Sequence, residues 1–163
     1  MLFDGVAELS QRLAAAGHHI TVETAGTVWL DELHCDLISI SPKLSHSTPH
    51  ARDPKWAARH EAARWAPRVV QRLIETHAEH QLKFVVRWRE PARIEADLGE
   101  IDAMLADLCA HGTTEPRVML MPECTDRHEL QRAYATLLPL CLERDWRLGE
   151  RLHIHIFGDR PGT

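Results

Sequence analysis

The chain has 163 residues, the length of one domain, and 44% of them are hydrophobic, which is enough for a sizeable core. Its 19 Lys and Arg residues against 24 Asp and Glu residues give a formal net charge of −5, so we expect no nucleic-acid partner. The sequence contains no apolar run of about 18 residues or more and no visible secretory signal. We therefore expect a cytoplasmic protein without a membrane partner.

Changes in the hydrophobic period divide the sequence into alternating helices and strands. In chain order we predict a helix over 6–16 that stops at Gly17, strands over 19–24 and 36–41, a loop over 42–54, a helical stretch over 56–80 with a break near Pro67, a strand over 82–88, a helix over 94–108 closed by His111-Gly112, a strand over 117–121, a helix over 127–142 and a fifth strand over 151–157. We expect Asp126 to cap the last helix together with Glu129, as a capping box.

This order of elements predicts a single α/β domain with a parallel sheet. The strands are rich in Val, Ile and Leu and look buried on both faces, which is typical of parallel strands with helices packed outside. No internal repeat or linker divides the chain. In such folds ligands bind beyond the carboxyl ends of the strands, so we expect the functional residues directly after each strand.

The cysteines are dispersed, at Cys35, Cys109, Cys124 and Cys141. Their spacing excludes a disulfide scaffold, a zinc knuckle and a CxxC motif, and it gives no local support to an iron–sulfur site. We expect them to be small buried hydrophobic residues.

Polar residues follow the first two predicted strands. Glu23 suits a ribose hydroxyl, a cation or an amine, and equally the capping of the next turn. Gly26 suits either a close backbone approach to a ligand or an ordinary tight turn. Ser41-Pro42-Lys43 is more informative, because the proline stops the strand while serine and lysine offer a hydroxyl and a positive charge to a carboxylate or phosphate. A lysine that merely lies at the surface is still the commoner case.

The later strand ends offer two further candidates. Met121-Pro122-Glu123 resembles the earlier serine–proline–lysine arrangement, with a carboxylate next to backbone groups that the proline frees. His153 and His155 fall on one face of the predicted fifth strand and suit two metal ligands, but the sequence identifies no third partner. Ordinary core or surface histidines are commoner, and His18-His19 and His46 have weaker claims still.

Several enzyme classes lack their motifs in this chain. It contains no GxSxG, no P-loop and no GxGxxG, so hydrolase, NTPase and dinucleotide-binding functions have no support. Trp56, Trp65 and Trp88 lie near arginines, and we expect them in the core or in cation–π contacts rather than in base stacking.

Five segments stand in an informative order and spacing: HHITVETAGT, DLISISPKLSHSTP, QLKFVV, VMLMPECTD and HIHIFGDRPGT. As a set they resemble the 7-carboxy-7-deazaguanine synthase family of radical S-adenosylmethionine enzymes, which act in queuosine and deazapurine biosynthesis. The resemblance implies a partial parallel (β/α) barrel and the conversion of 6-carboxy-5,6,7,8-tetrahydropterin to 7-carboxy-7-deazaguanine with loss of ammonia. It also implies a [4Fe–4S] cluster, S-adenosylmethionine and Mg²⁺ as the family's cofactors, and it allows a homodimer.

The resemblance carries over a set of residues to the S-adenosylmethionine site. They are Glu23, Thr24 and Gly26 of ETxGT, Ser41, Pro42 and Lys43 of SPK, and Met121, Pro122, Glu123 and Cys124 of MPEC. Ala25 stands where the family often has asparagine. Thr163 matches the chain end that closes over the pterin, so the resemblance implies a substrate contact there. No catalytic residue and no metal ligand is carried over.

Two family motifs have no counterpart in this chain. Family members bind their cluster through three cysteines spaced CxxxCxxC, or with a longer first gap, and hold the methionine amino group with a GGEP-like segment. The Mg²⁺ ligand and most pterin contacts also lie outside the shared region. The resemblance therefore implies that residues 1–163 are an incomplete domain, the C-terminal two-thirds of the family without its first strands and cluster loop.

We accordingly expect no radical activity from this chain by itself. Two alternatives stay open at this point. One is a non-catalytic nucleoside-binding or interaction module derived from the family. The other is an unrelated α/β metalloenzyme that uses His153, His155 and Glu123.

Overall fold

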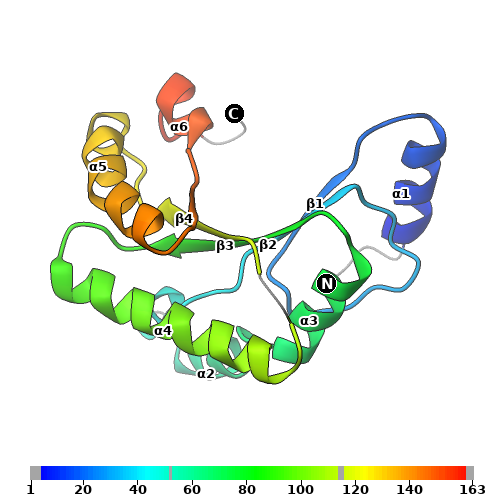
Figure 1. Cartoon of the computed structure of the whole chain (residues 1–163), viewed down its shortest axis with the longest axis horizontal. Helices are drawn as coiled ribbons and strands as arrows, with labels where there is room; N and C mark the ends of the chain where they lie inside the picture. Colours follow the sequence, from blue (N-terminus) through cyan, green and yellow to red (C-terminus); the bar gives the residue numbers. More distant parts are fainter. Residues whose placement is uncertain (1–4, 52, 114–115, 161–163) are drawn as a thin grey trace.

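The computed structural model describes residues 5–51, 53–113 and 116–160. Five parallel strands form one sheet in the order β1-β2-β3-β4-β5 (Figure 1). The strands are β1 (Thr21–Thr24), β2 (Leu37–Ile40), β3 (His80–Val86), β4 (Val118–Pro122) and β5 (Arg147–Leu148). The helices are α1 (Val6–Ala15), α2 (Pro54–Ala63), α3 (Pro67–Thr76), α4 (Pro91–Ala110), α5 (Arg127–Glu143) and α6 (Leu152–Phe157), with a 3-10 helix η1 (Ser45–Ser47). Within the described residues the sheet does not close, which fits the expected partial α/β barrel.

Prolines and aspartates set several helix starts. Pro54, Pro67 and Pro91 each open a helix, where the missing N–H of proline costs no hydrogen bond. Pro67 therefore divides the predicted helical stretch into α2 and α3. Asp126 caps α5 as predicted, because its carboxylate accepts a hydrogen bond from the backbone N–H of His128 at 2.7 Å.

The predicted capping box forms only in part. The Glu129 carboxylate binds Arg89 and Arg132. The Glu129 side chain therefore points to these arginines, whereas a capping box requires it to turn back to the start of the helix.

The fifth predicted strand is wrong, because residues 152–157 form the helix α6. Arg147 and Leu148 already occupy the free edge of β4 as β5, and Gly149 still donates its N–H to the Leu120 carbonyl before the chain leaves the sheet. The alternation in LHIHIF therefore has no strand to pair with. Ile154 packs inward at 1% exposure on α6, whereas Ile156 is 57% exposed. His153 and His155 point about 200° apart around a helix axis and do not share a face.

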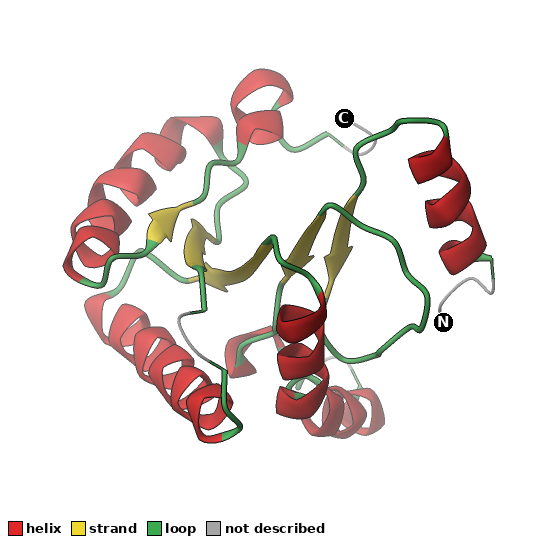
Figure 2. Ribbon diagram, turned by 45° about the vertical axis from the view of Figure 1, so that its right-hand side comes forward, coloured by secondary structure: helices red, strands yellow, loops and turns green. Residues whose placement is uncertain are grey.

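The sheet has one apolar face and one mixed face, so the prediction of strands buried on both faces is wrong. The outer face carries the apolar strand residues that are at most 4% exposed: Ile38, Ile40, Leu82, Phe84, Val86, Val118 and Leu120. Helices α3, α4 and α5 lie along this face (Figure 2). The alternate residues, including Glu23, Lys83 and Met121, face the other way and form what we call the inner face.

Two further findings concern the surface. No helix among the described residues is long and apolar enough to cross a bilayer. Trp88 is buried under the Arg89 guanidinium, as predicted for a cation–π contact, whereas Trp56 is 54% exposed beside Arg59.

Candidate functional site

The carboxyl ends of β1, β2 and β4 meet at a cavity of about 330 Å³ on the inner face. It is lined by Glu23, Thr24, Ala25, Ser41, Lys43, Lys83, Val85 and Met121. A neighbouring cavity of about 240 Å³ shares Ser41, Lys43 and Val85 with it and adds Pro42 and Glu123. The structure thus brings together residues of all three motifs that the sequence singled out, although they lie far apart along the chain.

An ion pair crosses the inner face of the sheet. The Lys83 ammonium lies 2.6 Å from a Glu23 carboxylate oxygen, and the pair joins β3 to β1 across β2. Below it, Ser39 is 1% exposed and its hydroxyl accepts a hydrogen bond from the Gln81 side chain at 2.9 Å. Sequence reasoning missed Lys83. A lysine between the apolar residues Leu82 and Phe84 is the signal that could have revealed the mixed face.

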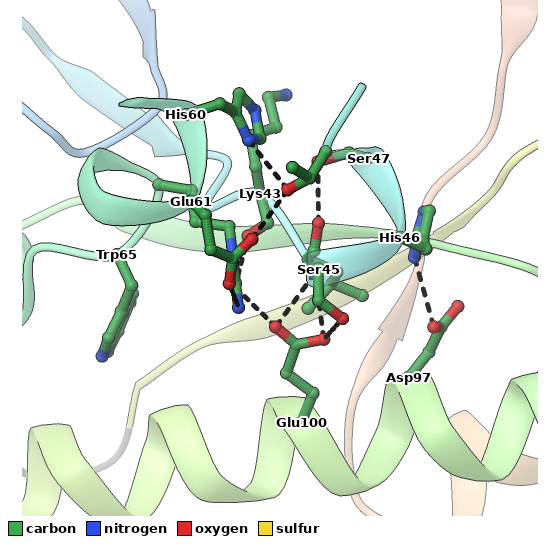
Figure 3. Close-up of polar contacts among 12 residues, drawn as sticks. Lys43, Ser45, His46, Ser47, His60, Glu61, Trp65, Asp97 and Glu100 are labelled. Carbon is green, nitrogen blue, oxygen red and sulfur yellow. Dashed lines mark hydrogen bonds and ion pairs between the residues drawn. The ribbon is translucent and has the colours of Figure 1, made fainter. Parts of the chain in front are cut away.

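The loop that carries Lys43 is tied to α4 through Glu100 (Figure 3). Both oxygens of the Glu100 carboxylate accept from the Ser45 backbone N–H at 3.0 Å, and one also accepts from the Ser45 hydroxyl at 2.7 Å. Arg64, just after α2, donates to Glu100 at 2.5 Å and to the Lys43 backbone carbonyl at 3.1 Å. Glu100 and Arg64 therefore fix the backbone of this loop and leave the Lys43 ammonium outside the network.

A second carboxylate on α4 anchors the end of β3. Asp97 is 1% exposed, accepts from the Arg87 backbone N–H at 2.8 Å and pairs with the Arg87 guanidinium at 2.6 Å. Its other contact is His46 of the same loop, at 3.2 Å (Figure 3). The hydrogen bonds that Arg87 donates to Asp97 raise the pKa of Arg87, which keeps this guanidinium charged. Asp97 thus links the loop after β2 to the end of β3.

Glu61 on α2 closes the same network. Its carboxylate accepts from Arg64 at 2.8 Å and from the Thr48 hydroxyl at 2.8 Å. These hydrogen bonds, chiefly that of Arg64, lower the pKa of Glu61 from its ordinary 4.5 to about 2. The loop after β2 is therefore held by carboxylates from two helices, α2 and α4.

Some residues that the resemblance assigns to the S-adenosylmethionine site do not offer an unbonded side chain to the cavity. Gly26 has φ +73, and a Cβ there would lie 2.8 Å from side-chain atoms of Ile40 and Val70, on the core side. The Thr24 hydroxyl accepts from the Gly26 N–H at 3.1 Å, and the Cys124 thiol donates to the Asp126 carbonyl. These residues shape the turns after β1 and β4. Within the described residues, Ser41, Lys43, Glu123 and Met121 line the cavities with side chains that make no such hydrogen bond.

The cysteines lie in separate parts of the fold. Cys124 and Cys141 are buried as expected, Cys35 is half-buried and Cys109 is exposed. Burial raises the pKa of Cys35 and of Cys141, which disfavours the thiolate that an iron ligand requires. Across the described residues, no group of three or more His, Cys, Asp or Glu side chains is arranged for a metal ion, including His153, His155 and Glu123. Thr163, the predicted substrate contact, lies outside the described residues.

Comparison with known proteins adds two relatives that cover the whole chain. It is 40% identical over 171 aligned positions to a 7-carboxy-7-deazaguanine synthase of Halobacterium salinarum and 35% identical over 164 positions to one of Rhodopirellula baltica. The chain spans 63% and 60% of these two proteins. No family model matches it, and no solved structure does. The resemblance of the motifs is thus confirmed: the chain is homologous over its full length to 7-carboxy-7-deazaguanine synthases, and corresponds to part of them.

Proposed function

We propose that this chain forms the S-adenosylmethionine-binding part, and contributes to the pterin site, of a radical enzyme that converts 6-carboxy-5,6,7,8-tetrahydropterin to 7-carboxy-7-deazaguanine with loss of ammonia. One observation carries the proposal: the ETxGT, SPK and MPE segments line two adjoining cavities at the carboxyl ends of the strands. The homology to two synthases of that name supports the reaction.

The residues of the two cavities suit a nucleoside cofactor. Ser41 offers a hydroxyl and Lys43 an ammonium group to the carboxylate or ribose of S-adenosylmethionine. Met121 presents a polarizable apolar wall of the kind that packs against a flat ring. In the complete enzyme that the resemblance implies, S-adenosylmethionine would supply the radical chemistry of the ring contraction. The chain's own residues would bind and orient it.

The described residues do not fit an iron–sulfur cluster. Three thiolates must converge on such a cluster, and here the cysteines lie in separate elements, two of them with a raised pKa. They do not fit a Mg²⁺ site either, because no acidic cluster converges among them. We therefore propose that the chain by itself binds ligands without radical turnover.

Calorimetry with residues 1–163 tests the binding part. S-adenosylmethionine should bind the wild type, and Lys43→Ala should weaken it about tenfold through loss of a charge-assisted hydrogen bond. Lys55→Ala is the matched control, because Lys55 is an exposed lysine on α2 outside both cavities. Absence of binding by the wild type, or equal loss in both variants, would contradict the proposed site.

Turnover tests the other part. After anaerobic treatment with iron, sulfide and a reductant, the chain should yield no 7-carboxy-7-deazaguanine by mass spectrometry. Product formation would refute the absence of activity. Genomic sequence upstream of Met1 offers a separate check, since the proposed radical enzyme requires CxxxCxxC and GGEP-like segments in frame. Ligand binding without any such segments would favour a non-catalytic nucleoside-binding module.

A further inference from the structure

Lys83 is an enclosed cation in the QLKFVV segment, and neither the residues carried over by resemblance nor the proposed cofactor contacts include it. Its side chain is 14% exposed, in the middle of the central strand β3, whereas the Glu23 side chain that pairs with it is 69% exposed. Enclosing an ammonium group costs desolvation free energy, and an ion pair with an exposed partner returns little of it. The position is therefore poorly explained as a device for stability.

The pair is placed for exchange with a ligand. Lys83 and Glu23 both line the 330 Å³ cavity. The ammonium has three N–H donors, and Glu23 is the acceptor that the structure shows for it. Because Glu23 is mostly exposed, it can turn toward water while another anion takes its place. A ligand would thus gain a preformed cation without first ordering a flexible surface lysine.

The charge of the cavity points to the kind of ligand. The residues that line it comprise two ammonium groups, Lys43 and Lys83, and one carboxylate, Glu23. Their net charge of one positive unit suits a ligand with a single negative group. Val85 and Met121 add apolar walls of the kind that accompany a flat ring.

We propose that Lys83 binds the carboxylate of the pterin substrate and that Glu23 is the counter-ion which this carboxylate displaces. This inference rests on the proposed function and deepens it, because it separates two cations of one cavity. Lys43 would serve S-adenosylmethionine and Lys83 the pterin. Glu23, assigned by resemblance to the cofactor, becomes the residue that holds Lys83 in place before the substrate arrives.

Two variants and three ligands test this separation. Calorimetry would compare wild type, Lys83→Met and Lys43→Met, each with 6-carboxypterin, with pterin that lacks the carboxylate, and with S-adenosylmethionine. Methionine keeps the length of the side chain and removes its charge, and circular dichroism would verify that each variant folds. Lys83→Met should weaken 6-carboxypterin about tenfold to a hundredfold and leave pterin and S-adenosylmethionine unchanged. Lys43→Met should weaken S-adenosylmethionine instead.

Each outcome decides one of the two claims. Unchanged 6-carboxypterin affinity in Lys83→Met, or an equal loss for pterin, would overturn the role of Lys83 while the proposed function stands. Wild-type protein that binds neither the pterins nor S-adenosylmethionine would overturn the proposed function and this inference with it.

Two conservative variants probe the ion pair itself. Lys83→Arg should recover part of the 6-carboxypterin affinity. Glu23→Gln should strengthen 6-carboxypterin binding several-fold, because the ammonium no longer has a competing carboxylate. Weaker or unchanged binding in Glu23→Gln would contradict the displacement of Glu23.

Discussion

Neighbouring residues of β3 meet opposite surroundings on the two faces of the sheet. Phe84 is fully buried against the helices of the outer face, whereas Lys83 and Val85 line the inner-face cavity. The outer face gains stability from apolar burial. The inner face holds an ion pair, a buried serine and residues of three motif segments, and we expect these groups to contribute less to stability than the apolar face does. Side-chain alternation along one strand thus places some residues in the core and others at the cavity.

The largest expected effect separates the two faces by stability. Phe84→Ala should lower the free energy of unfolding by about 3–5 kcal/mol, because it leaves a cavity in a fully buried site. Val85→Ala, one residue along on the inner face, should cost about 1 kcal/mol, because Val85 is only half-buried. Denaturant unfolding of both variants measures the difference. Equal losses of unfolding free energy in the two variants would show that both faces of the sheet contribute equally to the core.

Gly26 lies in the turn after β1, where this turn packs against the apolar core on the outer face of the sheet. Gly26→Ala should cost about 2–4 kcal/mol, because alanine is strained at φ +73 and its Cβ would crowd Ile40 and Val70. Gly99→Ala is the matched control in α4, where nothing lies within 4 Å of the added Cβ. It should stabilise the protein by about 0.5–1 kcal/mol. Thermal unfolding should therefore shift in opposite directions for the two glycines.

Asp97 tests how the outer layer of helices holds the site. Asp97→Asn should cost about 2–3 kcal/mol, because the Arg87 guanidinium and its N–H lose a charged acceptor. It should also weaken S-adenosylmethionine binding, because His46 no longer anchors the Lys43 loop to α4 through an ionised carboxylate. Glu95→Gln, an exposed carboxylate on the same helix, is the control. Denaturant unfolding and calorimetry on both variants check the two effects. Unchanged affinity of Asp97→Asn for S-adenosylmethionine would show that the Lys43 loop does not depend on its contact with α4.

The smallest effect concerns pH. The folded-state pKa of Glu61 is about 2, below its ordinary 4.5, so its contribution to stability is present above pH 4.5 and is lost as the pH falls toward 2. Unfolding measured between pH 5 and pH 2 should therefore show a shallower acid decline in Glu61→Gln than in the wild type. Identical pH profiles would mean that the contacts of Glu61 with Arg64 and Thr48 are not kept in solution.

Much of the fold followed from local patterns, and the exceptions have physical causes. Periodicity found the helices α1 to α5 and the first four strands, since each buries one side of a regular element. It failed over 152–157, where an alternating segment became a helix because β5 had already taken the edge of β4. Alternation cannot reveal whether a sheet edge is free. Likewise, apolar strand composition suggested burial on both faces, and only Lys83, Glu23 and Ser39 show that one face is mixed.

The sequence by itself determined the residue types of the site and the family resemblance, because both are written in short contiguous segments such as ETAGT, SPK and MPEC. The tertiary structure decided which of those residues turn toward a cavity and which serve the turns, as with Lys43 and Gly26. It also decided the partners of charged groups. Glu23 meets Lys83 across β2, 60 residues away in the chain, because parallel pairing sets the register of three strands at once. Contacts of that kind depend on long-range packing, which no local pattern encodes.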